Sequence, residues 1–148
     1  MSSGGSTCTS TATSFAVGLG TNTTSTATGL FDGAIAAGTD ASATAVGTGN
    51  LALAAGNPAI VGGNTFDTQA TAKGTGNLAA AIGNGAQAGA SATGTPTPTS
   101  IGNNTALTVG KGANSYAGEI PPFAGANAPN NQFALAGPAN TTINAINP

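Results

Sequence analysis

The chain has 148 residues, the size of one domain or of one domain and a tail. Only 4% of its residues are charged and the formal net charge is −2, so the sequence lacks the clustered Lys and Arg that nucleic-acid binding requires. It has no His, no Trp and 24 Gly, and it is 39% hydrophobic, which favours a thin core of small aliphatic residues over disorder.

Residues 1–6 are expected to be flexible, and alternating threonines begin directly after them. Alternate residues of a strand point to one side, so these threonines predict a grid of hydroxyl and methyl groups. The candidate surface-binding residues are Thr7, Thr9, Thr11, Thr13, Thr24, Thr26 and Thr28. The pentapeptide TSTAT occupies positions 9–13 and recurs at positions 24–28. A third set is interrupted by prolines and comprises Thr93, Thr95, Thr97 and Thr99.

Cys8 is the only cysteine of the chain and lies within the first threonine run. A single cysteine cannot form an internal disulfide. We therefore expect either a free thiol that acts as an ordinary small residue or a bridge between two chains.

The clearest pattern is an internal repeat, because 14 of 20 positions are identical between residues 43–62 and residues 70–89. Repeats of this kind indicate stacked units, each of which covers the apolar face of its neighbour. The 27-residue spacing divides into two units of about 14 residues, which is close to the offset between the two TSTAT copies. The sequence therefore predicts an all-β parallel solenoid or roll over residues 7–118, in seven or eight coils of about 14 residues.

Glycine recurs so often that uninterrupted runs are too short for stable helices, and Thr and Val favour strands. Within 51–55, Leu51, Leu53 and Ala55 share one face, which we predict to be buried, while Ala52 and Ala54 share the other. In the second copy of the repeat a large residue is lost and another is gained two positions along, which conserves volume on that face. Further predicted core residues are Val17, Val46, Ile60, Ile101, Leu107 and Val109.

Residues 119–148 differ in character, since they do not repeat and they contain five of the eight prolines. Proline removes a hydrogen-bond donor, so this segment is not expected to continue a central sheet. It is interpreted either as a cap, with Phe123 and Phe133 covering the last coil, or as a linker.

Short tripeptides that end in glycine recur along the chain at Ala45-Val46-Gly47, Ala81-Ile82-Gly83, Ser100-Ile101-Gly102 and Thr108-Val109-Gly110. Together with the GxG and GN turns, this pattern resembles the head repeats of trimeric autotransporter adhesins over about two thirds of the chain. The resemblance implies a left-handed parallel β-roll, three chains side by side, and a bacterial surface. The neck and membrane anchor of that family are not seen, and the C-terminal segment is unlike it.

The threonine runs resemble the ice-binding face of insect hyperactive antifreeze proteins, which are also rich in Ala, Gly and Thr. That resemblance implies a flat threonine face that binds ice. The middle of the chain departs from the pattern, and threonine is also simply a good residue for an exposed strand.

Residues for enzymatic chemistry are sparse, and no enzyme, cofactor or metal site is predicted. The carboxylates Asp32, Asp40, Asp67 and Glu119 are not paired in sequence, and without His there is neither a serine triad nor a usual zinc set. No stretch has the length of an apolar membrane span.

The sequence therefore predicts a non-enzymatic, extracellular structural or adhesive module that is secreted or at the cell surface. We expect it to bind itself, as a trimer or a fibre, and also carbohydrate or matrix surfaces, but not nucleic acid. No signal-peptide pattern is visible, so any export signal is expected to be missing from this chain. The alternative prediction is an ice-binding protein.

Overall fold

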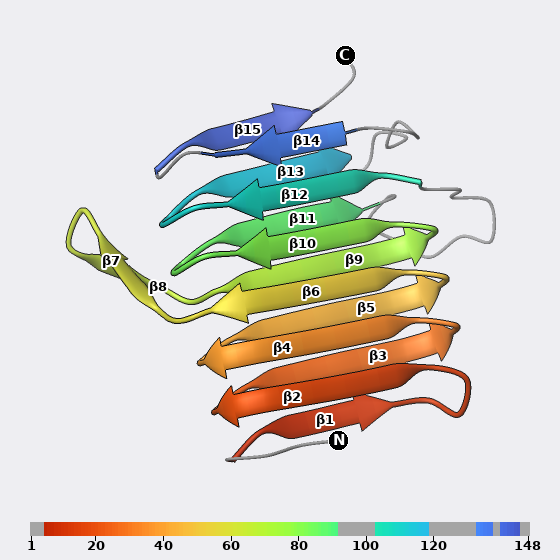
Figure 1. The fold of residues 1–148 in the computed structure, drawn as a ribbon. Helices are drawn as coiled ribbons and strands as arrows, with labels where there is room; N and C mark the ends of the chain where they lie inside the picture. The colour runs from red at the N-terminus through yellow and green to blue at the C-terminus, as the bar shows by residue number, and fades with distance from the viewer. Residues whose placement is uncertain (1–4, 92–102, 119–132, 138–139, 146–148) are drawn as a thin grey trace.

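The computed structural model describes residues 5–91, 103–118, 133–137 and 140–145, and it confirms the predicted all-β parallel solenoid (Figure 1). A six-stranded sheet has the order β14-β12-β10-β6-β4-β2 and a seven-stranded sheet has the order β1-β3-β5-β9-β11-β13-β15. The strands of the six-stranded sheet are β2 (Phe15–Thr21), β4 (Gly33–Thr39), β6 (Leu51–Gly56), β10 (Leu78–Ile82), β12 (Thr105–Val109) and β14 (Phe133–Ala136). Those of the seven-stranded sheet are β1 (Thr7–Ser10), β3 (Thr24–Leu30), β5 (Ser42–Thr48), β9 (Gln69–Thr75), β11 (Gln87–Ser91), β13 (Asn114–Gly118) and β15 (Thr142–Ala145).

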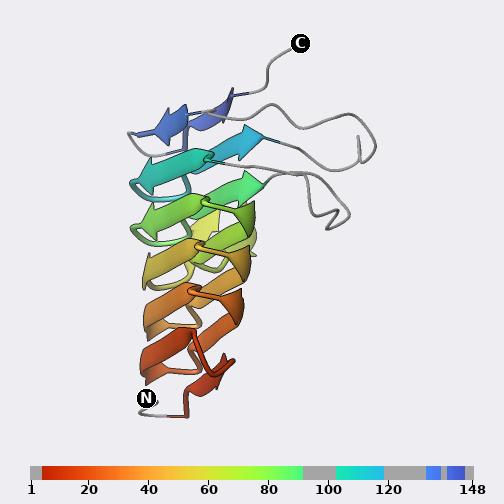
Figure 2. The same cartoon turned by 90° about the vertical axis from the view of Figure 1, so that its right-hand side faces the viewer.

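The chain alternates between the two sheets, so each coil contributes one strand to each of them. Figure 2 shows the result as two layers of strands stacked along one axis. Neighbouring strands within both sheets are parallel and in register. The successive coils therefore place equivalent residues directly above one another, and side chains form rows that cross the strands.

The predicted coil length was wrong, because the coil in the structure is longer. Phe15 pairs with Gly33, and Thr24 pairs with Ser42, which gives an 18-residue coil. The 27-residue repeat is one such coil with an insertion, and Ala43 pairs with Ala70 across it. The TSTAT offset was also misleading, because Thr9 pairs with Thr26 and not with Thr24. A shift of two positions leaves an alternating pattern unchanged, so the pattern alone does not fix the register.

The first insertion is a small antiparallel hairpin of β7 (Ala59–Val61) and β8 (Asn64–Phe66), which projects from the stack (Figure 1). Its turn consists of Gly62 and Gly63, both with positive φ (57° and 83°), as a two-residue type I′ turn requires. Ile60 lies on this hairpin and is 68% exposed, so its prediction as a core residue was wrong.

The core lies between the two sheets and consists almost entirely of alanine, which reverses the predicted burial of 51–55. Ala52 and Ala54 are fully buried, whereas Leu51 is 40% exposed and Leu53 is half-buried on the outer surface. Adjoining strands of one coil are joined by connections as short as Asn22 and Thr23, and the buried side chains of the paired strands that the structure describes are Ala, Ser and Thr. The other large predicted core residues also lie on outer surfaces: Val17 and Leu107 are half-buried, and Val46 and Val109 are exposed. Ile101 lies outside the described residues.

The corners between the sheets depend on backbone conformations that glycine adopts easily. Gly38 has φ 121°, and a side chain there would collide with the carbonyl oxygen of Gly56 in the next coil. At the opposite corner, Gly49 and Gly76 each have φ 67°. Phe31 occupies the equivalent corner position with φ 58°, although bulky residues rarely adopt this conformation.

Strands β14 and β15 extend both sheets beyond residue 118, where the repetitive region was expected to end. Phe133 pairs with Thr105 and is exposed on the outer surface of the six-stranded sheet, so it does not cover the end of the core. The prediction for Phe123 falls outside the described residues, as do the predictions for residues 1–4 and for the rest of 119–132.

Candidate contact surfaces

The outer surface of the six-stranded sheet is apolar. Its outward side chains form three rows across the strands, and they include large aliphatic and aromatic residues at many positions. We call this surface the apolar face, and its large residues are Phe15, Val17, Leu19, Ile35, Leu51, Leu53, Leu78, Ile82, Leu107, Val109, Phe133 and Leu135. Alanines and Gly33 complete the rows, and Thr105 is the polar exception. The protein thus places its small apolar residues inside and its large ones outside.

The relief of the apolar face follows from the register. In the middle row, Ala80 lies between Leu53 and Leu107 and is only 8% exposed. At one end of the first row the Phe15 ring lies over Gly33. The contact is so close that a Cβ atom added to Gly33 would be 2.5 Å from the Phe15 Cζ atom. Gly33 therefore provides the space that the Phe15 ring occupies.

The outer surface of the seven-stranded sheet is polar and carries stacked threonines. Thr9, Thr26, Thr44 and Thr71 pair consecutively and form a continuous row. In the adjacent row Thr7 pairs with Thr24, which is followed by other polar residues. We call this outer surface the threonine face.

The structure brings together only some of the predicted surface-binding residues. Thr7, Thr9, Thr24, Thr26 and Thr28 lie on β1 and β3 and point outward on the threonine face. The third threonine set lies outside the described residues.

Thr11 and Thr13 instead belong to the first corner and bind the backbone there. The Thr11 Oγ1 atom lies 2.8 Å from the Gly29 carbonyl oxygen and 3.2 Å from the Gly29 backbone nitrogen, and the Thr13 Oγ1 atom donates to the same carbonyl at 3.2 Å. These two side chains therefore stabilise the corner.

Thr44 and Thr71 extend the threonine row, although sequence reasoning did not select them. The signal was present in the alternating residues Ser42, Thr44 and Val46. They lie one coil after Thr24, Thr26 and Thr28 and pair with them. An 18-residue period relates Thr26 to Thr44, and the 27-residue repeat relates Thr44 to Thr71, whereas the 14-residue period moved these positions out of register.

An asparagine ladder runs inside one corner of the stack. Asn50, Asn77 and Asn104 are buried at matching positions of successive coils. The Asn77 backbone nitrogen donates to Asn50 Oδ1 at 3.0 Å, and the Asn104 nitrogen donates to Asn77 Oδ1 at 3.0 Å. The Nδ2 amide of Asn77 donates to the Lys73 carbonyl oxygen at 2.6 Å. The Asn50 and Asn77 side chains therefore each join their own coil to the next one.

Asp32 ends this ladder and has a different environment. Its Oδ1 atom accepts two hydrogen bonds from Asn50, but its buried Oδ2 atom has no hydrogen-bond partner. A Cβ atom on Gly29 would collide with both Asp32 Oδ2 and the Gly47 carbonyl oxygen, so these two oxygens lie beside each other. At the equivalent position one coil on, the Asn50 Nδ2 amide donates to the Gly74 carbonyl at 2.8 Å. Asp32 thus presents an oxygen where the ladder otherwise presents a donor.

Tyr116 is the single tyrosine and lies half-buried on the threonine face, against Gly89. Its hydroxyl donates to Gln87 Oε1 at 3.2 Å. Burial raises the pKa of the Tyr116 phenol above its usual value of 10.0, because desolvation disfavours the phenolate.

Groups that could bind a metal ion do not gather among the residues that the structure describes. No three His, Cys, Asp or Glu side chains lie together in this part of the chain. Cys8 is half-buried on β1, on the inner side of the sheet, and Glu119 is outside the described ranges. In the same described residues, no helix has the length and apolarity needed to cross a bilayer. The two extended faces are therefore the candidate contact surfaces of the described stack.

A scan of protein-family models, a search of curated proteins and a search of solved structures each return no match for this chain.

Proposed function

We propose that this chain is a non-enzymatic structural or adhesive module of the extracellular surface, secreted or held at the cell surface, which associates with itself. The observation that carries the proposal is the pairing of two extended faces of opposite character, one apolar and one rich in hydroxyl groups, on a single stack. Large exposed apolar surfaces on soluble proteins are typical of interaction sites.

The two faces suit different contacts. Hydroxyl and amide groups in rows on the threonine face favour broad, weak contact with carbohydrate or matrix surfaces, without one dominant residue. The apolar face favours self-association, and the proposed function holds for a pair, a trimer or a fibre. Both roles require a long, regular surface, which a solenoid supplies.

The proposal is tested with fluorescent beads that carry the chain at controlled density. We expect such beads to clump with one another and to adhere to coats of polysaccharide or matrix protein, whereas beads that carry the unfolded chain do neither. Beads that stay dispersed and pass over every coat would contradict the proposal.

Ice binding is a second candidate, and the in-register row Thr9, Thr26, Thr44 and Thr71 is the observation that favours it. The test is the thermal hysteresis of the purified chain. If the threonine face binds ice, Thr26→Leu and Thr44→Leu abolish the hysteresis, while Leu53→Ala on the opposite face leaves it unchanged. Absence of hysteresis in the wild-type chain excludes this function.

A further inference from the structure

The apolar face is large enough to form a specific protein interface. Six strands spaced about 4.8 Å apart and five residues of about 3.3 Å each give a face of about 500 Å². Two such faces in contact bury about 1,000 Å², which is the size at which specific interfaces begin. The described face carries no charged side chain, so no ion must be desolvated when it is covered.

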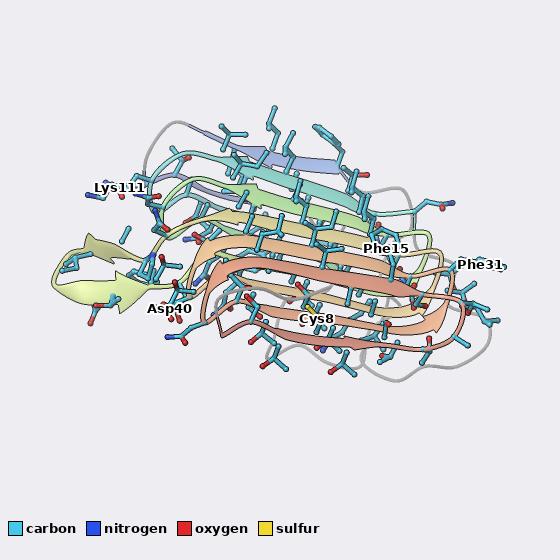
Figure 3. The ribbon with its side chains drawn as sticks, turned by 60° about the horizontal axis from the view of Figure 1, so that its bottom comes forward. Cys8, Phe15, Phe31, Asp40 and Lys111 are labelled. Atoms are coloured by element: carbon cyan, nitrogen blue, oxygen red, sulfur yellow. The ribbon has the colours of Figure 1, made fainter. Side chains whose placement is uncertain are left out.

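The charged side chains that the structure describes lie elsewhere, which argues against a lipid surface as the occupant. Surfaces that bind membranes usually surround their apolar patch with Lys and Arg. Lys73 points outward on the opposite sheet, and Lys111 lies in a corner beyond the end of β12. Figure 3 shows Lys111 and Asp40 at one end of the coils and Phe15 and Phe31 at the other. An uncharged face without a basic rim fits another uncharged face.

We propose that the apolar face is covered by the apolar face of a second copy of this chain. This inference rests on the proposed self-association and identifies its interface. A two-fold pair uses the same patch on both partners, whereas a ring of three needs two different, complementary patches. The other broad surface of the described stack is polar, so the single apolar face found among the described residues favours a pair.

The relief of the two faces supports this packing. Both copies carry side-chain rows with the same spacing between strands, so the ridges of one can lie in the grooves of the other, as on the inner faces of a β-sandwich. The short side chain of Ala80 between Leu53 and Leu107 leaves room for a residue of the partner. The pair would have four sheet layers, with a threonine face on each outer surface.

The experiment compares the full chain with three variants by sedimentation equilibrium. Leu53→Asp and Leu53→Lys each place a charge in the middle of the apolar face. Thr44→Asp is the matched control, because Thr44 points outward from β5 in the same coil. Circular dichroism of each variant verifies that it remains folded, which is expected because both side chains point away from the core.

We expect a wild-type mass of twice 13.7 kDa, the same mass for Thr44→Asp, and a dissociation constant raised at least about 100-fold for each Leu53 variant, because a charge would be buried without a partner. A mixture of Leu53→Asp and Leu53→Lys should form the pair again, since opposite charges then meet across one interface.

Three outcomes overturn the inference. A trimeric wild-type chain, or a pair that is broken by Thr44→Asp and not by the Leu53 variants, rejects this interface but leaves self-association intact. A monomeric wild-type chain at about 100 µM, which exceeds the dissociation constant of ordinary specific pairs, rejects both proposals. If that monomer also binds phosphatidylcholine vesicles and Leu53→Asp does not, the apolar face is a lipid-binding surface.

Discussion

Asn50 donates two hydrogen bonds to a single oxygen of Asp32, from its backbone nitrogen at 2.8 Å and from its side-chain amide at 3.0 Å. The other carboxyl oxygen of Asp32 is buried beside the Gly47 carbonyl and has no partner. We expect Asp32→Asn to raise the free energy of unfolding by about 1–2 kcal/mol, because the new amide can donate to that carbonyl. Urea denaturation of both proteins measures the difference.

The reverse change at the next rung is the control. In Asn50→Asp, the donor to the Gly74 carbonyl becomes an acceptor, which we expect to lower the free energy of unfolding by at least about 2 kcal/mol. Equal stabilities for wild type and Asp32→Asn would show that the unpartnered oxygen carries no penalty.

Asn77 is the middle rung of the ladder and connects two neighbouring coils. Replacement by Ala removes the acceptor of the Asn104 backbone nitrogen and the donor to the Lys73 carbonyl oxygen, whereas the Asn77 backbone nitrogen still donates to Asn50 Oδ1. We expect a loss of about 3 kcal/mol in the free energy of unfolding. Hydrogen exchange should locate the effect, with faster exchange at the Asn104 amide than at amides of β2. A uniform change along the stack would indicate a loss of general packing instead.

The alanine core predicts opposite responses at adjacent positions of β6. We expect Ala54→Leu to destabilise the fold by about 3 kcal/mol or more, since the fully buried Ala54 has no space for three further carbons. Leu53→Ala should change the stability of the separated chain by less than about 1 kcal/mol, because Leu53 lies on the outer surface. Thermal unfolding at low protein concentration distinguishes the two. A larger loss from Leu53→Ala than from Ala54→Leu would contradict the observed orientation of β6.

Phe31 has φ 58° and is 74% exposed, in a corner position that is glycine in two other coils. Left-handed backbone conformations cost a bulky residue about 1–2 kcal/mol, so Phe31→Gly should stabilise the chain by about 1 kcal/mol. Gly49→Phe, at the equivalent corner one coil on, should destabilise it by a similar amount. Calorimetry measures both, and a less stable Phe31→Gly variant would mean that the exposed ring makes a stabilising contact.

We expect the free energy of unfolding to depend on pH in the alkaline range because of Tyr116. Its folded-state pKa is raised above 10.0, so the native chain holds the phenolic proton more tightly than the unfolded chain does. Well below pH 10.0 the contribution of this group to the free energy of unfolding does not change with pH. The free energy of unfolding then falls as the pH rises through 10.0, and this decrease ends above the folded-state pKa. Because the chain has one tyrosine and no tryptophan, tyrosinate absorbance follows this titration directly, and Tyr116→Phe removes that part of the decrease.

The architecture could be predicted from the sequence because repetition and glycine spacing directly reflect stacking. The two copies of the 27-residue repeat occupy equivalent positions in adjacent coils, since Ala43 pairs with Ala70. The coil length could not be derived from it, because an insertion has the same effect on spacing as a longer coil. An alternating run such as 7–13 also fits several registers equally well.

The orientation of the strands was predicted incorrectly for a physical reason. The usual rule places larger apolar residues inside, but the buried side chains of the paired strands that the structure describes are Ala, Ser and Thr, with Cys8 packed against them. Leu51 and Leu53 are therefore on the outer surface. The asparagine ladder was also missed, although Asn50 and Asn77 occupy matching positions of the repeat, because a buried amide appears in sequence as an ordinary turn residue.

The insertions at the corners have a consequence for how such a chain changes in evolution. Residues 43–62 and 70–89 share 14 of 20 residues and are adjacent in the stack, so unequal recombination between their coding segments would add or remove one complete turn of the solenoid together with its hairpin. The alanine interior and the ladder would meet again across the new junction without a change in register. The number of coils in this protein could therefore change by whole units. Each recombination event would widen or narrow both outer faces by one strand.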